Sequence, residues 1–170
     1  KTAILHPEKP LNLTIPLRKG KHQQMIIDDV TISYDEPWPK IHMAALQAAY
    51  GKTAYFDEIG SGLETILFSE IKNLWDLNFR LIQFISDLLP GQWPLETTNQ
   101  YLGHYMPSIV DLRAGVPGGT SSIPDEDYPV YTQVHRLHKA HLPNLSILDA
   151  LCHLGPDTYS YLKKYASKLY

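Results

Sequence analysis

Cysteine is scarce in this chain: among its 170 residues, Cys152 stands alone. A single cysteine excludes a disulfide within the chain and is typical of a reducing compartment. The sequence also has no uninterrupted apolar run of about 18 residues, so we expect no membrane span. It carries no secretory signal. These absences together predict a cytoplasmic protein.

The chain also lacks a large excess of positive or negative charge, and it lacks the common nucleotide-binding motifs. The 15 basic and 18 acidic side chains leave a formal net charge of −3, without a basic arm or an acidic tail. We therefore expect no nucleic-acid partner. The sequence contains no Walker loop, no G-x-G-x-x-G and no G-x-S-x-G motif. We predict no cofactor, and no hydrolase with a nucleophile elbow.

Hydrophobic residues make up 44% of the chain, which is enough for a core and predicts a single domain over residues 1–170. Alternating apolar and polar residues predict a strand over Leu11–Ile15 that ends at Pro16. After a polar turn, Met25–Ile32 predicts a second strand, antiparallel to the first.

The middle of the chain predicts helices. Pro37 and Pro39 open a helix over Trp38–Tyr50. The apolar face expected to be buried carries Trp38, Ile41, Ala45 and Ala48. The sequence Ser61-Gly-Leu-Glu64 resembles a capping box and predicts the start of the next helix. Its apolar stripe runs to Pro90, with a break near Asn73.

Two short helices, Leu145–Leu154 and Pro156–Leu169, are expected to close the chain. Before them, residues 114–127 are rich in Gly, Pro and Ser and predict a long loop. We expect this loop to act as a lid over a functional cleft, or to be a tolerated surface insertion. The fold class predicted is α+β, a helix-rich single domain with a small antiparallel sheet.

Histidines at His135, His138 and His141 have a spacing that suggests metal binding. On one helix, however, these positions spread over roughly 240°, so the three side chains cannot face one ion. A zinc site would need a further ligand such as Asp149 or Cys152. We expect no metal site and interpret the histidines as core or boundary residues.

Ser146 and Asp149 are compatible with a serine–acid catalytic pair. Ser-x-x-Asp directly before an apolar run is also a helix-capping arrangement, in which the serine accepts a backbone N–H bond and the acid reaches back. We expect the capping role.

Polar residues elsewhere could bind or act on a ligand. Arg18 and Lys19 lie in a basic turn that could hold a phosphate, although such turns are usually just solvated. His42 lies near the apolar face of its helix, and its ring has a pKa suited to acid–base work. His104 and the pair Asp111-x-Arg113 flank the long loop; the pair could position a substrate or merely tie down the loop.

Several motifs in this order resemble those of the WbqC-like family of bacterial proteins, which is associated with surface-polysaccharide gene sets. They are Leu11–Pro16, Trp38-x3-His42-x7-Tyr50, Leu74-x3-Asn78, Asp111-x-Arg113, Pro129-x-Tyr131-x-Gln133, and Asn144–Asp149 continued through Gly155. The resemblance implies a transferase or modifying enzyme acting on a sugar or sugar-nucleotide precursor. The alternative is a non-catalytic binding or scaffold protein of the same pathway.

On the enzyme interpretation, His42 or His104 would serve as general base and Asp111 would orient it. The residues expected to bind the substrate are Arg18, Lys19, Arg113, Tyr131 and Gln133. Two departures from the family pattern are expected. The chain lacks a segment with which members usually begin, and it carries His135, His141 and Cys152 where relatives carry phenylalanine. Phenylalanine positions are packing positions, which argues further against a metal site.

Overall fold

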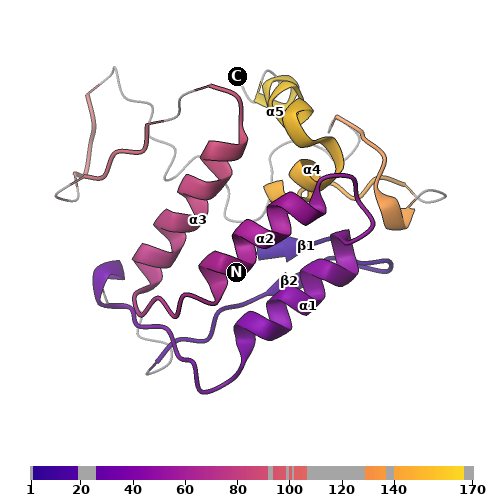
Figure 1. The fold of residues 1–170 in the computed structure, drawn as a ribbon. Helices are drawn as coiled ribbons and strands as arrows, with labels where there is room; N and C mark the ends of the chain where they lie inside the picture. The colour runs from indigo at the N-terminus through magenta and orange to yellow at the C-terminus, as the bar shows by residue number, and fades with distance from the viewer. Residues whose placement is uncertain are drawn as a thin grey trace.

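The computed structural model describes residues 2–18, 26–91, 94–98, 100, 102–106, 129–136 and 140–166. It confirms the helix-rich α+β class, with one small antiparallel sheet beside packed helices (Figure 1). The helices are α1 (Trp38–Tyr50), α2 (Phe56–Leu67), α3 (Leu74–Leu88), α4 (Ile147–Leu154) and α5 (Thr158–Ala166). The strands are β1 (Thr2–Ile4) and β2 (Leu11–Leu13), and the 3-10 helices are η1 (Ile27–Asp29), η3 (Val134–Arg136) and η4 (Gly155–Asp157).

The sheet does not pair as predicted. β2 forms within the expected strand, but its antiparallel partner is β1, with Ile4 opposite Leu11. The predicted second strand is wrong, because η1 occupies residues 27–29. The chain nevertheless returns antiparallel, through an isolated bridge between Leu17 and Ile32. The connection between β1 and β2 is short, so these two strands pair with each other. The later segment makes isolated bridges instead, from Ile32 to Leu17 and from Thr31 to Asn73.

Helix α1 has the predicted bounds, but a different face is buried. Ile41 is 56% exposed, and Ala48 is also exposed. The buried side includes His42 and Tyr50, whose hydroxyl accepts a hydrogen bond from the Leu5 N–H at 2.9 Å. The predicted face is right at Trp38, which is buried, and wrong at Ile41 and Ala48, because the buried stripe continues through His42, Leu46 and Ala49.

Helix α2 begins at Phe56, so the predicted start at Ser61 is wrong. Ser61 lies inside the helix, where its carbonyl accepts a hydrogen bond from the Thr65 hydroxyl at 3.0 Å. The predicted break near Asn73 is confirmed. The Asn73 side chain caps α3 by accepting from the backbone N–H groups of Trp75 (2.7 Å) and Asp76 (3.3 Å).

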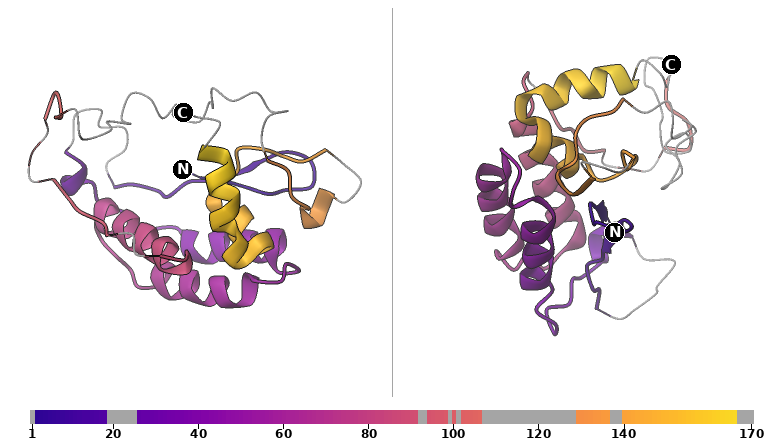
Figure 2. Two further views of the ribbon diagram at one scale, coloured as in Figure 1. Left: turned by 90° about the horizontal axis from the view of Figure 1, so that it is seen from above. Right: turned by 90° about the vertical axis from the view of Figure 1, so that its right-hand side faces the viewer.

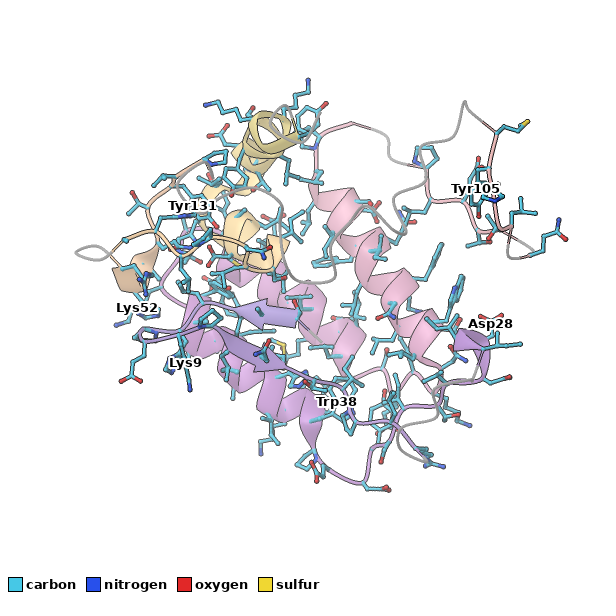
Figure 3. The ribbon with its side chains drawn as sticks, turned by 180° about the vertical axis from the view of Figure 1, so that it is seen from behind. Lys9, Asp28, Trp38, Lys52, Tyr105 and Tyr131 are labelled. Atoms are coloured by element: carbon cyan, nitrogen blue, oxygen red, sulfur yellow. The ribbon has the colours of Figure 1, made fainter. Side chains whose placement is uncertain are left out.

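The core lies between the helices and the strand pair. α2 packs against α1, α3 and α4, and seen from behind the two strands cross one face of α1 and α2 (Figure 3). Figure 2 shows α5 at one end of the molecule, beyond α4. The largest fully buried apolar side chains are Tyr50, Ile4, Leu5, Ile32, Leu77, Leu151 and Cys152. Among the described residues, no helix is both long and apolar enough to cross a bilayer.

Candidate functional sites

Of the residues predicted to be catalytic, the structure describes His42 and His104. His42 is 8% exposed and its ring packs against Trp38 at 5.2 Å between centroids. Burial lowers the pKa of His42, which disfavours its charged form. His104 is exposed, as is Arg18. Asp111, together with the substrate-binding candidates Lys19 and Arg113 and the loop 114–127, lies outside the described residues.

Tyr131 and Gln133 come together in a buried network centred on Asp149. The Asp149 side chain is fully buried, at 0% exposure, and Gln133 is 2% exposed. One carboxylate oxygen, Oδ2, accepts hydrogen bonds from the Tyr131 hydroxyl and from Gln133 Nε2, the latter at 2.8 Å. These bonds satisfy one of the two carboxylate oxygens and so reduce the cost of burying the carboxylate, whereas Oδ1 has no hydrogen-bond partner among the described residues.

The Gln133 amide also forms hydrogen bonds with the backbone of Leu142. Its Nε2 also donates to the Leu142 carbonyl at 3.0 Å, while its Oε1 accepts from the Leu142 N–H at 2.8 Å. The side chain therefore joins the segment before α4 to the Asp149 carboxylate within α4. With both ends of the amide used inside the protein, Gln133 holds this region together.

The Asp149 carboxylate sets the electrostatics of its surroundings. Burial, followed by the charge of Asp149, raises the pKa of the Tyr131 and Tyr50 hydroxyls, so both stay protonated. The same two causes raise the pKa of Cys152 to about 12. A thiol with such a pKa is a poor nucleophile, so Cys152 is a packing residue.

His153 locks α4 to the preceding 3-10 helix. Its Nε2 accepts a hydrogen bond from the Val134 N–H at 3.0 Å, and its Nδ1 contacts the Asp149 carbonyl at 2.7 Å. Since a backbone N–H can only donate, Nε2 must carry the lone pair and Nδ1 the hydrogen. Nδ1 lies 3.7 Å from Asp149 Oδ1, too far for a good hydrogen bond. His153 is thus a structural residue of the network.

Ser146 caps α4, as expected. Its hydroxyl oxygen accepts from the Leu148 N–H at 3.4 Å. The reciprocal half of the predicted capping box is wrong, because the Asp149 carboxylate turns inward to Tyr131 and Gln133. The inward turn places the carboxylate in the network described above.

The cap makes a stability prediction. We expect Ser146→Ala to lower the free energy of unfolding by about 1 kcal/mol, because the first turn of α4 loses its side-chain acceptor. Urea denaturation monitored by circular dichroism measures this difference. Ser160→Ala, an exposed position inside α5, is the control and is expected to change stability by less than about 0.5 kcal/mol. Equal effects of the two substitutions would contradict the capping role.

The histidines of the His-x2-His-x2-His pattern face different partners. His135 Nε2 lies 3.1 Å from the Ala48 carbonyl, whereas the His141 ring packs edge-on against Tyr131 at 4.8 Å. His138 lies outside the described residues. Within the described ranges, no three His, Cys, Asp or Glu side chains are placed to share a metal ion.

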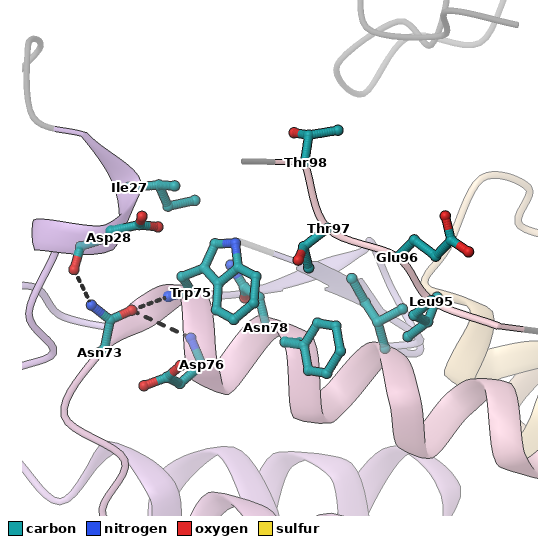
Figure 4. Close-up of a pocket in the computed structure, with 12 residues that line it drawn as sticks. Ile27, Asp28, Asn73, Trp75, Asp76, Asn78, Leu95, Glu96, Thr97 and Thr98 are labelled. Carbon is teal, nitrogen blue, oxygen red and sulfur yellow. Dashed lines mark hydrogen bonds between the residues drawn. The ribbon is translucent and has the colours of Figure 1, made fainter. Parts of the chain in front are cut away.

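An open groove of about 940 Å³ lies between η1, the first half of α3 and residues 95–98 (Figure 4). Two aromatic side chains of α3, Trp75 and Phe79, form part of its wall. They are four residues apart and therefore lie on one face of the helix. Their rings stack at 5.2 Å between centroids with only 9° between the planes. This pair supplies an apolar part of the groove wall.

Polar groups surround the aromatic pair. The lining contains the carboxyl groups Asp28, Asp76 and Glu96, the amides Asn73 and Asn78, and the hydroxyls Thr97 and Thr98. Among the described lining residues, none carries a basic side chain. Asn73 Nδ2 donates to the Asp28 carbonyl and so ties η1 to the start of α3 (Figure 4). The groove therefore offers hydrogen-bonding groups and negative charge around an aromatic pair.

Sequence reasoning missed this groove, although a signal was present. Trp75 and Phe79 have the i, i+4 spacing that places two rings side by side on a helix, and Asp76 and Asn78 lie between them. Asp28 and Glu96 also line the groove, but they belong to segments distant in the sequence from Trp75 and Phe79. No local pattern indicates that they meet α3.

The chain was compared with protein families, with known protein sequences and with solved structures. The profile of the WbqC-like protein family matches residues 1–114. The chain belongs to this family. It is also similar to "Uncharacterized protein Rv1507c" of Mycobacterium tuberculosis, with 27% identity over 175 aligned residues that cover 89% of this chain and 75% of that protein. No solved structure matches the chain.

The family match includes the groove but not the buried network around Asp149. Residues 1–114 include α1 to α3 and all described residues that line the groove. The block from Pro129 to Asp149, which also prompted the resemblance to the WbqC-like family, lies beyond the matched residues. The groove is thus a feature of the part of the chain that the family profile describes.

Proposed function

We propose that this WbqC-like protein binds a sugar of a bacterial surface polysaccharide, or of its precursor, and acts on it as a transferase or modifying enzyme. The observation that carries the proposal is the stacked Trp75–Phe79 pair, edged by carboxylates and amides in an open groove. The apolar face of a sugar ring can lie on an aromatic side chain, while its hydroxyls bond to carboxylates and amides. The groove supplies both kinds of contact.

The negative charge of the groove limits the classes of ligand that it can bind. Asp28, Asp76 and Glu96 would repel a diphosphate placed among them, because like charges at short range are unfavourable. The lining therefore supports an uncharged sugar unit, or one that carries an amino group, rather than the phosphate half of a sugar nucleotide. A nucleotide donor would have to place its phosphates elsewhere, for instance near Arg18, Lys19 or Arg113, the cations expected from the sequence.

The alternative is a binding protein of the same pathway that performs no chemistry. One observation favours it: His42 is buried against Trp38, and neither it nor His104 lines the groove. On the enzyme proposal, a groove carboxylate would take over as general base. Incubating the protein with sugar acceptors and candidate donors, with product detection by mass spectrometry, separates binding from turnover.

Sugar binding in the groove is tested by Trp75→Ala. A sugar that covers about 50 Å² of the ring at about 25 cal/mol/Å² gains about 1.3 kcal/mol, so affinity is expected to fall about tenfold. Isothermal titration with neutral and amino monosaccharides measures the loss.

Phe68→Ala is the matched control, since Phe68 is an exposed aromatic residue, at 48%, that lines a different groove between α1 and α2. Its sugar affinity is expected to remain that of the unmodified protein. Equal affinity of the Trp75 variant and the unmodified protein would overturn the proposed binding mode.

A further inference from the structure

The groove beside α3 is elongated. Its described lining follows α3 from Asn73 to Ile82, which corresponds to about 14 Å along the helix axis. Residues 95–98 form the opposite wall and lie on the side of the groove away from the α3 ribbon in Figure 4. At about 3.3 Å per residue, this segment can reach along about 13 Å of the groove. Two walls of similar length therefore border the groove, with η1 at its Asn73 end, where the Asn73 side chain bonds to the Asp28 carbonyl.

The size of the groove exceeds what one sugar ring needs. Its volume of about 940 Å³ lies at the upper end of the range of about 300–1,000 Å³ that holds a whole drug-sized molecule. A pyranose unit with its two linking oxygens is about 5 Å long, judged from bonds of about 1.5 Å. A monosaccharide on the aromatic pair would therefore leave most of the length of the groove unused.

Hydrogen-bonding groups are distributed along this length. Asn73 lies at the η1 end and Asn78 further along α3, while Thr97 and Thr98 contribute hydroxyls from the opposite wall. No hydrogen bond joins the backbone of residues 95–98 to another described residue, so the N–H and C=O groups of that segment are available to a ligand. Each sugar hydroxyl can both donate and accept. Groups spaced in this way can bond to the hydroxyls of successive sugar units.

We propose that the groove binds a chain of about three linked sugar units, its length set by walls of about 14 Å and units of about 5 Å. This inference rests on the proposed sugar-binding function and narrows its ligand from a sugar to an oligosaccharide. One unit lies on the Trp75–Phe79 pair, and its neighbours extend along α3 toward Ile82. In a reaction sequence, enzymes that form glycosidic bonds must therefore supply the ligand of this protein.

A chain-length series tests the proposal. Isothermal titration of the full chain uses two neutral series, from glucose to cellopentaose and from N-acetylglucosamine to its β-1,4-linked pentamer. We expect affinity in at least one series to rise at least about tenfold from monosaccharide to trisaccharide, because added units gain contact area, and then to level off. Equal affinity for monosaccharide and trisaccharide would overturn this inference but leave sugar binding in the groove intact. Absence of binding in both series would overturn the proposed function together with the inference.

Ile82→Ala tests the far end of the groove. Ile82 lies about 10 Å along the helix axis from Trp75, beyond the reach of one sugar ring on the aromatic pair. The substitution is expected to weaken trisaccharide binding about threefold, through the loss of about 25 Å² of apolar contact, and to leave monosaccharide binding unchanged.

Ile41→Ala is the matched control. Ile41 is an isoleucine on α1 that is 56% exposed, against 51% for Ile82, and it does not line the groove. Both saccharides are expected to bind this variant as they bind the unmodified protein, and circular dichroism checks that both variants fold. An Ile82 variant that keeps full trisaccharide affinity, or that loses affinity equally for both saccharides, would contradict an extended site.

Discussion

Replacing Gln133 by leucine is expected to lower the free energy of unfolding by about 3–5 kcal/mol, because it breaks a buried polar network. Leucine keeps most of the volume but removes the donor to Asp149 and both hydrogen bonds to Leu142. The Asp149 carboxylate, at 0% exposure, would keep the Tyr131 hydroxyl as a donor but lose the Gln133 amide. The backbone N–H and C=O of Leu142 would also lose their partner.

Urea denaturation gives the change in unfolding free energy, with an unchanged m-value as evidence that the transition stays two-state. Gln83→Leu is the matched control. Gln83 Nε2 donates to Asp87 Oδ1 at 2.8 Å between successive turns of α3, at the surface. Such a pair contributes only about 0.2–0.5 kcal/mol. A Gln133 variant that loses no more stability than the control would show that the buried network does not hold this part of the fold together.

Gly155→Ala is expected to cost about 3 kcal/mol or more, through two separate causes. Gly155 has φ 54° and ψ −125°, a backbone conformation that residues with a Cβ rarely adopt. An added Cβ would also lie 2.4 Å from Cε1 of the Tyr55 ring, well inside van der Waals contact. The Tyr55 ring, which is 37% exposed, would have to move away to relieve the clash.

Thermal unfolding of two further variants separates the two causes. Tyr55→Ala combined with Gly155→Ala removes the clash and is expected to lose less stability than the sum of the single substitutions, with the backbone strain remaining. Gly103→Ala is the control, since nothing lies within 4 Å of the position that a Cβ would take there. Full additivity of the two single effects would show that the Tyr55 contact contributes nothing.

Much of the helical structure could be read from the sequence, because local chemistry determines it. The bounds of α1 follow from the prolines at its start, and the break before α3 follows from Asn73, whose side chain caps the helix. Ser146 starts α4 for the same kind of reason. Where local signals compete, they failed: Ser61-x-x-Glu64 has the pattern of a cap but lies inside α2, because the helix starts earlier, at Phe56.

Tyr131 and Gln133 show how far the sequence could predict the candidate sites. The sequence marked both as important polar residues, but not that they meet Asp149, 18 and 16 positions further along the chain. Asp149 itself looked like half of a capping box, and only the contacts of Tyr131 and Gln133 with α4 turned its carboxylate inward. The groove has the same origin, since Asp28 and Glu96 reach the Trp75–Phe79 pair from separate segments.

The sequence by itself therefore determined the fold class, most helix boundaries and the family, because these depend on short-range propensity and on motifs in linear order. The tertiary structure decided which strand pairs with β2, which face of α1 is buried and which polar groups share a site. These features depend on contacts between distant residues, such as the bond from the Leu5 N–H to the Tyr50 hydroxyl. The free energy of such a contact arises only when packing removes both groups from water, and no local pattern in the chain records it.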